Sequence, residues 1–467
     1  MSATTTRSLI VPAALLVLVC SPIAWAQAHP PRYIVQVLDS LEGGYTFAHA
    51  LNDVGQSTGC SGSYIDSRHA FLAQPDGTIV NIESLPCDES AGLTINNSGQ
   101  VAGVLLTHPQ AGASFTRPFR YTPGVGMIEL GAPEYQTHYL SVAVNIDEAG
   151  NVIGHWTMPA PPPFEHHAYM YTDAGGFVDV GDFGYPRTHL SDSDSTEQAV
   201  GYSHVDVGHA HACLWSGGAL QDLGTLGGNN SEALALNQYG TVVGSSATGD
   251  GSWRAFHRTV WGGLQPLPEP PDAVHSSADF VTDTGVIVGS WTSPDFNTRT
   301  FYYTSSTGTV DVDPYLGDPA YTMPLAVNDA GEIIIQVAGC DPTEFLYYFS
   351  PDAGGHTLRS LLSEHFPGRF AGCAGLNNSG QILVNCDFGS ASTTFAALLS
   401  PVQAGDINCD GAINTFDIDP FVLAMTNPTA YATEYPLCDY LLADITGDGN
   451  VTAFDIDPFV QLLTAAD

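Results

Sequence analysis

Two stretches near the carboxyl end place oxygen-bearing side chains at fixed intervals. Residues 406–417 and 444–455 each carry them at positions 1, 3, 5, 9 and 12, with glycine at position 6. Ca²⁺ takes about six to eight oxygen ligands from loops of this spacing. The backbone carbonyls of Ala412 and Asn450 would add the position-7 ligands. The sequence thus predicts two calcium sites, whose other ligands are Asp406, Asn408, Asp410, Asn414 and Asp417 in the first and Asp444, Thr446, Asp448, Thr452 and Asp455 in the second.

The same string, Phe-Asp-Ile-Asp-Pro-Phe-Val, follows each loop at 416–422 and 454–460. Position 12 is Asp rather than Glu, and Gly405 directly precedes the first loop, so neither loop is entered from a long helix as in an EF-hand. This duplicated loop-then-helix unit resembles a type I dockerin domain over residues 405–467, although the interval that carries Cys438 is longer than in that family. The resemblance implies calcium-dependent attachment to a cohesin-like or cell-surface partner.

In a dockerin the pairs Thr415/Phe416 and Ala453/Phe454 would lie at the recognition positions. The alternative is that both phenylalanines pack in the core of the small domain. Residues 405–467 hold eleven acidic and no basic residues. Because carboxylates in an empty loop repel one another, calcium binding is expected to be coupled to folding here.

The middle of the chain repeats a unit of about 46 residues. A short apolar segment occurs in eight copies. A turn of the Asn-x-x-Gly type occurs seven times, and an eighth, degraded copy lies near 190–201. Alternating apolar residues on both sides of the turn predict strands, and Asn with Gly predicts hairpins. The segments begin at His69, Arg117, His167, His211, Arg254, Arg299, Glu344 and Thr393.

A unit of this length with four short strands is the size of a propeller blade. The chain enters and leaves its repeats in mid-unit, so the last strands can complete the first blade. We therefore expect a mainly β fold, a closed β-propeller of about eight four-stranded blades over 27–404, followed by a small α-helical calcium domain. Seven blades is the alternative if the copy near 190–201 forms no sheet of its own.

The repeats resemble the HAF family of probable extracellular repeats. His69-Ala-Phe carries the triplet that gives the family its name, and residues 222–228, Asp-Leu-Gly-Thr-Leu-Gly-Gly, match its companion motif. The resemblance spans about residues 33–400. It implies an exported β repeat protein and no reaction.

Charge and targeting limit the function. The chain has 467 residues, 49 Asp and Glu against 11 basic residues, all of them Arg, and a net charge of −38. This charge argues against nucleic acid and anionic membranes as partners. Residues 1–26 have the charged start, apolar stretch and small-residue cleavage site of a signal peptide, and no later stretch is long enough to span a membrane. The predicted location is secreted, extracellular or at the surface of a bacterial cell.

Eight cysteines remain after Cys20 in the signal segment, an even number that favours disulfides in an exported chain. Three pairs are neighbours in sequence, and Cys213 resembles a buried strand residue. The sequence leaves the connectivity open among the candidates Cys60/Cys87, Cys373/Cys386 and Cys409/Cys438.

Other candidate residues have simpler explanations. His204, His209 and His211 could hold a metal, but His211 occupies the repeated basic position. That position either pairs with acids in the repeats (Glu129, Asp179, Asp222, Asp313) or forms a ring of donors around a central channel. Trp156, Trp253, Trp261 and Trp291 are expected to be exposed and able to stack on sugars, and Trp215 is expected in the core.

No nucleophile elbow, metalloprotease or nucleotide-binding motif is present in the sequence. The favoured function is a secreted, non-catalytic binding or scaffold protein, with a glycan or partner on the propeller and two Ca²⁺ ions in the attachment module. The alternatives are an extracellular glycoside hydrolase or lyase in polysaccharide degradation, and a structural cell-surface protein.

Overall fold

The computed structural model describes residues 30–63, 68–108, 115–131, 140–158, 165–259, 262–270, 272–338, 344–362, 366–389, 394–436 and 438–465. The predicted signal peptide, Trp261 and Thr393 lie outside these residues. The described chain is mainly β, as expected. None of its helices is long and apolar enough to cross a membrane.

The described strands form six four-stranded sheets and one eight-stranded sheet. All neighbours in a four-stranded sheet are antiparallel. The first such sheet contains β2 (Tyr45–Leu51), β3 (Ser57–Gly62), β4 (Arg68–Ala73) and β5 (Ile79–Asn81). The eight-stranded sheet joins two similar groups through one parallel pair, Leu140 with Thr116. Its strands are β6 (Glu89–Ile95), β7 (Val101–Thr107), β8 (Phe115–Thr122), β9 (Gly126–Glu129), β10 (Leu140–Ile146), β11 (Val152–Met158), β12 (Glu165–Thr172) and β13 (Gly176–Asp179).

Four further sheets follow in chain order. They contain β14 (Thr188–Ser193), β15 (Ala199–His204), β16 (Ala210–Ser216) and β17 (Ala219–Gly224); β18 (Gly227–Leu236), β19 (Val242–Thr248), β20 (Trp253–Arg258) and β21 (Gln265–Pro266); β22 (His275–Val281), β23 (Ile287–Thr292), β24 (Thr298–Thr304) and β25 (Gly308–Asp311); and β26 (Thr322–Val327), β27 (Ile333–Val337), β28 (Leu346–Ser350) and β29 (Gly354–Thr357).

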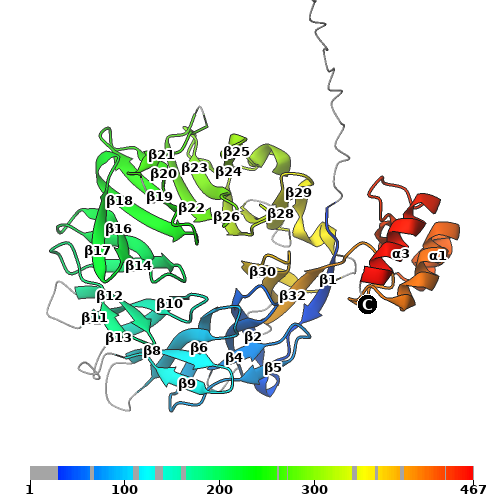
Figure 1. Cartoon of the computed structure of the whole chain (residues 1–467), viewed down its shortest axis with the longest axis horizontal. Helices are drawn as coiled ribbons and strands as arrows, with labels where there is room; N and C mark the ends of the chain where they lie inside the picture. Colours follow the sequence, from blue (N-terminus) through cyan, green and yellow to red (C-terminus); the bar gives the residue numbers. More distant parts are fainter. Residues whose placement is uncertain are drawn as a thin grey trace, which may run out of the picture.

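The last sheet combines both ends of the strand-rich region. β30 (Arg369–Leu376), β31 (Ile382–Asp387) and β32 (Phe395–Pro401) pair in order, and β1 (Tyr33–Val37) pairs with β32. Figure 1 shows β1 beside β32 and the sheets following one another around a common centre. The first strand of each four-strand group contacts the first strand of the next, and β30 contacts β2. Short 3₁₀ turns lie at Leu41–Gly43, Asp313–Leu316 and Leu358–Leu361.

Every one of these first strands carries an irregularity in its pairing with the second strand. In six groups a glycine of the second strand lies opposite it. At Gly244 a Cβ would lie 2.0 Å from the carbonyl oxygen of Glu232, so no larger residue fits without moving backbone. Each segment of the Val-Val-Gly type therefore needs a glycine at its end, because the backbone of the first strand lies too close for a side chain.

The hairpin turns link the sheets as well as the strands. Asn377 is buried, and its Oδ1 accepts hydrogen bonds from the amides of Ser379 (3.1 Å) and Gln381 (2.8 Å) in its own turn. Its Nδ2 donates to the carbonyl of Asn52 in the first sheet (2.9 Å). The same inter-sheet bond recurs from four other turn residues to the carbonyl of the corresponding turn, and these donors are Asn52, Asn96, Asn237 and Asn328.

The degraded repeat near 190–201 forms the hairpin β14–β15 of a complete four-stranded sheet. Asp194 replaces Asn there, and its Oδ1 accepts from the amides of Thr196 and Gln198. Glu197 occupies the glycine position at φ 60°. The turn chemistry thus persists with different residue types.

A helical region follows β32. It contains the 3₁₀ turns Thr415–Asp417, Tyr440–Ala443 and Ala453–Asp455 and the helices α1 (Ile418–Thr426), α2 (Pro428–Glu434) and α3 (Ile456–Ala465). The rings of Phe421 and Phe459, from the duplicated strings, stack with centroids 4.3 Å apart. Their cluster includes Val402 after β32, and Ile34 of β1 packs against it. Figure 1 shows this region beside the β1/β32 sheet.

We predict that Asn377→Ala lowers the free energy of unfolding by about 1–3 kcal/mol, because buried amides and the Asn52 carbonyl lose their partners. Urea unfolding measures this. Asn81→Ala is the matched control, since Asn81 is exposed and accepts only from the Glu83 amide among the bonds recorded for it. Equal losses in the two variants would contradict the role of the inter-sheet bond.

Candidate functional site

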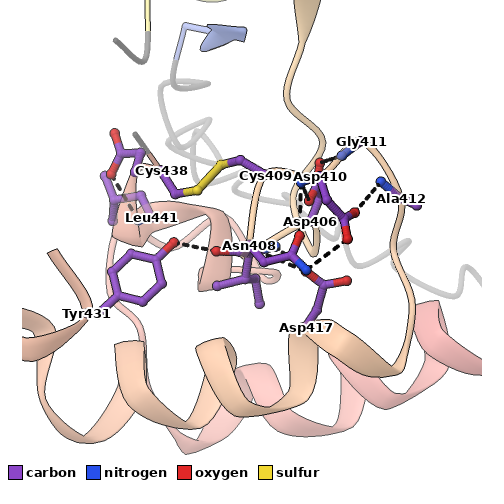
Figure 2. The surroundings of a disulfide bond; sticks show 12 residues. Asp406, Asn408, Cys409, Asp410, Gly411, Ala412, Asp417, Tyr431, Cys438 and Leu441 are labelled. Carbon is purple, nitrogen blue, oxygen red and sulfur yellow. Dashed lines mark hydrogen bonds between the residues drawn. A yellow bond between two sulfur atoms is a disulfide. The ribbon is translucent and has the colours of Figure 1, made fainter. Parts of the chain in front are cut away.

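The first predicted calcium loop, residues 406–417, is closed by two buried carboxylates. Asp406 accepts from the amides of Asp410 (3.1 Å) and Gly411 (3.0 Å), as Figure 2 shows. Asp417 accepts from the amides of Ile407 (2.7 Å), Asn408 and Asn414 (2.8 Å). The first and last residues of the loop therefore hold its backbone in a tight turn.

The remaining predicted ligands of this loop are drawn into the same turn. Asn408 Nδ2 donates to Asp410 Oδ2 (2.9 Å), and Asp410 Oδ1 accepts from the Ala412 amide (3.0 Å). Asn414 Nδ2 donates to the Ala412 carbonyl (3.2 Å), while its Oδ1 caps the following 3₁₀ turn. Gly411 adopts φ 90°, which favours glycine at position 6.

The second loop, residues 444–455, repeats this arrangement. Asp444 and Asp455 are buried at its two ends. Asp444 accepts from the amides of Asp448 and Gly449, and Asp455 accepts from those of Thr446 and Thr452. Asp448 accepts from the Asn450 amide. Two segments 38 positions apart in number thus share one hydrogen-bond pattern.

The charges in the first loop oppose one another. Burial, together with the carboxylates of Asp417 and Asp410, raises the pKa of Asp406 to about 6. Within the described residues, no three His, Cys, Asp or Glu side chains lie close enough together to hold a metal ion by themselves. Both loops instead offer carboxylate, amide or hydroxyl, and backbone oxygens, which is the donor chemistry that Ca²⁺ takes.

The disulfide Cys409–Cys438 joins the first loop to the segment before the second, with Cα atoms 5.9 Å apart. Figure 2 shows it next to Tyr431, whose hydroxyl donates to the Ile407 carbonyl (2.7 Å). The other two neighbouring pairs do not form. Cys213 is buried as expected, and burial raises the pKa of its thiol to about 12. The free thiols among the described residues are Cys60, Cys87, Cys213, Cys373 and Cys386.

Phe416 and Phe454 are exposed, by 76% and 80%. The alternative that both pack in the core is wrong, because Phe421 and Phe459 occupy it instead. Two matching apolar surfaces result, each a phenylalanine followed by two exposed aliphatic residues one helical turn apart. Surface 1 is Phe416, Ile418 and Val422, and surface 2 is Phe454, Ile456 and Val460.

The repeated position pairs with an acidic side chain within its own repeat. The side chains lie on third strands, two strands away from those that meet at the centre. This geometry supports the structural interpretation over a ring of donors. The pairs are His69–Glu83 (3.0 Å), Arg117–Glu129 (2.5 Å), His167–Asp179 (3.2 Å), His211–Asp222 (2.9 Å), Arg254–Glu269 (3.0 Å) and Arg299–Asp311 (3.3 Å).

One predicted partner was wrong. Arg299 pairs with Asp311 and with Asp318 (2.8 Å), whereas Asp313 is buried. Asp313 accepts from the Thr300 amide and the Thr322 hydroxyl, so it links two sheets. Burial raises its pKa to about 6. Glu344 is exposed just before β28.

The tryptophan expectation is partly wrong, and His211 pairs with an acid as the other residues at the repeated position do. His209 pairs with Asp206 and His211 with Asp222, so the structure does not bring His204, His209 and His211 together as one site. The expected exposure of Trp156 and Trp291 is contradicted by their burial, while Trp253 is half-buried and Trp215 is in the core. Trp156 stacks on His167 at 4.4 Å between centroids.

Three hollows have walls that sequence reasoning missed. One of about 570 Å³ lies between the first sheet and its neighbour and includes Phe47, His49, Arg68 and Glu89. One of about 450 Å³ is acidic and lies among the hairpin turns, which bring Asp53, Asp147, Asp194, Asp283 and Asp329 together. A third, rich in histidine, lies between β11–β12 and β14–β15. Each is built from several repeats, so no local spacing reveals it.

No protein-family model and no curated protein matches the chain. The HAF and dockerin resemblances therefore rest on the motifs alone. Among solved structures, the chain is similar to TolB from Acinetobacter baumannii (12% identity, 69% of this chain and 79% of that chain, TM-score 0.35). It is also similar to the β-propeller domain of the Trilobed protease from Pyrococcus furiosus (10%, 56% and 80%, 0.36) and to a six-bladed lectin from Aleuria aurantia (11%, 60% and 96%, 0.29). At these scores no argument about function rests on them.

We predict that Arg254→Gln lowers the free energy of unfolding by about 1–3 kcal/mol, because Glu269 keeps a poorly solvated charge without its partner. Urea unfolding at pH 7 measures this. Arg68→Gln is the matched control: the Arg68 side chain is 52% exposed, against 23% for Arg254, and its pair with Glu89 should contribute below about 1 kcal/mol. A larger loss in Arg68→Gln would contradict the structural role of the repeated pair.

Proposed function

We propose that the protein is an exported, non-catalytic scaffold, a closed eight-bladed β-propeller over residues 27–404 with a calcium-dependent attachment module over 405–467. Eight groups of four strands support the blade number, with β14–β17 among them and β1 completing the last. The contacts from β2 through each first strand to β30 and back to β2 support closure.

The observation that carries the calcium proposal is the matching construction of the two loops. In each, buried aspartates at positions 1 and 12 hold the backbone, and the intervening oxygens gather in one turn. Asp406, Asn408, Asp410, Asn414, Asp417 and the Ala412 carbonyl would hold one ion. Asp444, Thr446, Asp448, Thr452, Asp455 and the Asn450 carbonyl would hold the other. Bound Ca²⁺ would neutralise carboxylates that otherwise repel.

The attachment proposal rests on surfaces 1 and 2. Single exposed apolar side chains are normal on a protein surface, but here the same set of three occurs twice at equivalent positions. A cohesin-like protein is the proposed partner, bound through either surface. The packing of Ile34 and Val402 against this module would hold it beside the propeller. The disulfide Cys409–Cys438 would tie together two segments within the module.

The propeller would carry the ligand. The hollow at Phe47 and His49 combines aromatic rings with the Arg68–Glu89 pair, a mixture that suits a glycan. A glycan array run with a panel of polysaccharide hydrolysis assays tests this function. Binding without turnover supports the scaffold, turnover favours the glycoside hydrolase or lyase, and neither favours a structural cell-surface role.

We predict two calcium ions per chain by isothermal titration calorimetry. Asp406→Ala and Asp444→Ala should each remove one, because each deletes the first ligand of one loop. Helix content by circular dichroism should fall when EDTA removes the metal. Asp419→Asn is the matched control, an exposed acid of α1 outside the loops. Unchanged stoichiometry in both loop variants would sink the assignment.

We further predict that a type I cohesin domain binds the calcium-loaded chain. Phe416→Asp and Phe454→Asp should each leave binding in place, since one surface remains, and the double variant should lose at least about tenfold in affinity. Phe296→Asp is the control, because Phe296 is 87% exposed in the strand-rich region. Surface plasmon resonance measures the unaltered chain and the four variants. Failure of the unaltered chain to bind cohesin would refute this partner while leaving calcium binding intact.

A further inference from the structure

A hollow of about 270 Å³ lies between two neighbouring sheets, and most of its wall is histidine. His155 of β11 and His189 of β14 approach with ring centroids 4.8 Å apart. The ring of Tyr202, on β15, stacks against His189 at 5.4 Å with an interplanar angle of 10°. The complete wall is His155, His166, Arg187, Thr188, His189, Tyr202 and His204.

Several nitrogen atoms of this wall are left without a partner. Within the described residues, Nδ1 of His155, Nδ1 of His189 and Nε of Arg187 are buried and make no hydrogen bond. The other two histidines are held in place: His166 Nδ1 lies 3.1 Å from the Thr157 hydroxyl, and His204 Nδ1 lies 3.2 Å from the Asp206 carbonyl. Buried polar atoms normally have hydrogen-bond partners. Three unpartnered atoms in residues that line one hollow therefore indicate that a hydrogen-bonding ligand is missing.

The charges of the wall residues indicate the sign of the charge that the missing ligand carries. None of the wall residues is acidic, although the chain has 49 acidic residues. Among the ion pairs of the described residues, seven arginines have a carboxylate partner, whereas Arg187, like Arg258, has none. Of these two, only Arg187 lines the hollow. Arg187 instead lies over the ring of Tyr185, 5.7 Å from its centroid. A cation and four histidines around one space suit an anion.

We propose that this hollow binds a carboxylate or sulfate group of an acidic ligand, with Arg187 supplying the permanent charge and His155 and His189 the orphan donors. The flat faces of His189 and Tyr202 would accommodate the ring of an acidic sugar. A metal ion fits less well, because the permanent positive charge of Arg187 would repel it.

The binding is coupled to protons. Burial, together with His189 and His166, lowers the pKa of His155 to about 4, and burial lowers the pKa of His189. Burial and then Arg187 lower that of His166. A bound anion favours the charged imidazolium and raises these pKa values. The complex therefore takes up protons, and affinity increases as the pH falls, by up to about tenfold per pH unit for each proton taken up.

The groups that face these rings come from every neighbouring element. β12 contributes His166, on which the neighbouring His167 acts only through its charge. The segment before β14 contributes Arg187, and β15 contributes Tyr202 and His204. A carboxylate of the next sheet, Glu232 on β18, acts on Tyr202, whose pKa is raised first by burial and then by that charge. The pKa values of His155, His166 and His189 are thus lowered by burial and by neighbouring basic residues.

Saturation-transfer NMR on the full mature chain tests the proposal, with sodium glucuronate as the probe and glucose as its neutral match. Ionic strength is held constant with NaCl at pH 7.5, 6.5 and 5.5. We expect glucuronate to bind, glucose not to bind, and affinity to rise at each step down in pH. Sulfate that displaces glucuronate shows a general oxyanion site, and sulfate that does not shows one selective for carboxylate; both support the proposal.

Variants assign the binding to this hollow. Arg187→Gln and His189→Gln should each weaken glucuronate by about tenfold or more, since each removes a charge-assisted bond. Arg258→Gln and His257→Gln on β20 are matched controls of the same residue types and should bind normally. Thermal unfolding by circular dichroism identifies any misfolded variant, and Arg187→Lys then tests the charge in a folded chain.

Three results would overturn the proposal: no binding of glucuronate or sulfate at any pH, equal binding of glucose, or no effect of Arg187→Gln in a folded chain. Zn²⁺ binding to the unaltered chain, lost in His189→Gln while both anions fail to bind, would replace it with a metal site. The calcium loops and the hollow at Phe47 are separate, so failure here leaves the proposed function unchanged.

Discussion

Hydrogen bonds between the first and last sheets are the constraint on which the strand-rich region depends. Asn377 donates to a carbonyl 325 residues earlier in the chain, and the amide of Asn385 both donates to and accepts from the backbone of Ala48. β1 adds a full strand to β32. Closing so long a loop costs little more entropy than closing a short one, since the cost grows only with the logarithm of length. Side-chain amides can therefore hold the ends together once the intervening sheets have formed.

Three residues of the repeated pattern each hold strands or sheets together in a different way. The turn asparagine joins one hairpin to the next, and the glycine of the second strand lets the first strand pass close to it. The basic residue of the third strand binds the acid near the fourth, and in two repeats that acid also accepts from the first serine of the next sheet. Glu83 with Ser90 (2.5 Å) and Glu269 with Ser276 are these two cases. A pair within one sheet thus also fixes the position of its neighbour.

Features that depend on local spacing could be predicted, and features that depend on packing between distant segments could not. The strands, the turns and the hydrogen-bonded form of both twelve-residue loops follow from residues a few positions apart. Phe416 and Phe421 are five positions apart and equally apolar. Phe421 is the buried one because it packs in the core cluster, where its ring stacks on Phe459. Trp156 is buried because His167 lies against it on the next strand. Cys60 and Cys87 are close in sequence and yet remain free.

The histidine-rich hollow is another feature that local sequence spacing could not predict. His155 and His189 stand in different sheets, at positions that the repeat motif leaves variable, so no spacing rule associates them. What the sequence does supply is the scarcity of positive charge: with 11 arginines and no lysine, an arginine without a carboxylate partner is conspicuous. The acidic turns around the centre lie elsewhere, and none of the residues that line this wall is acidic. Because like charges would repel an acidic ligand from most of this surface, a local reversal of sign concentrates its binding at one place.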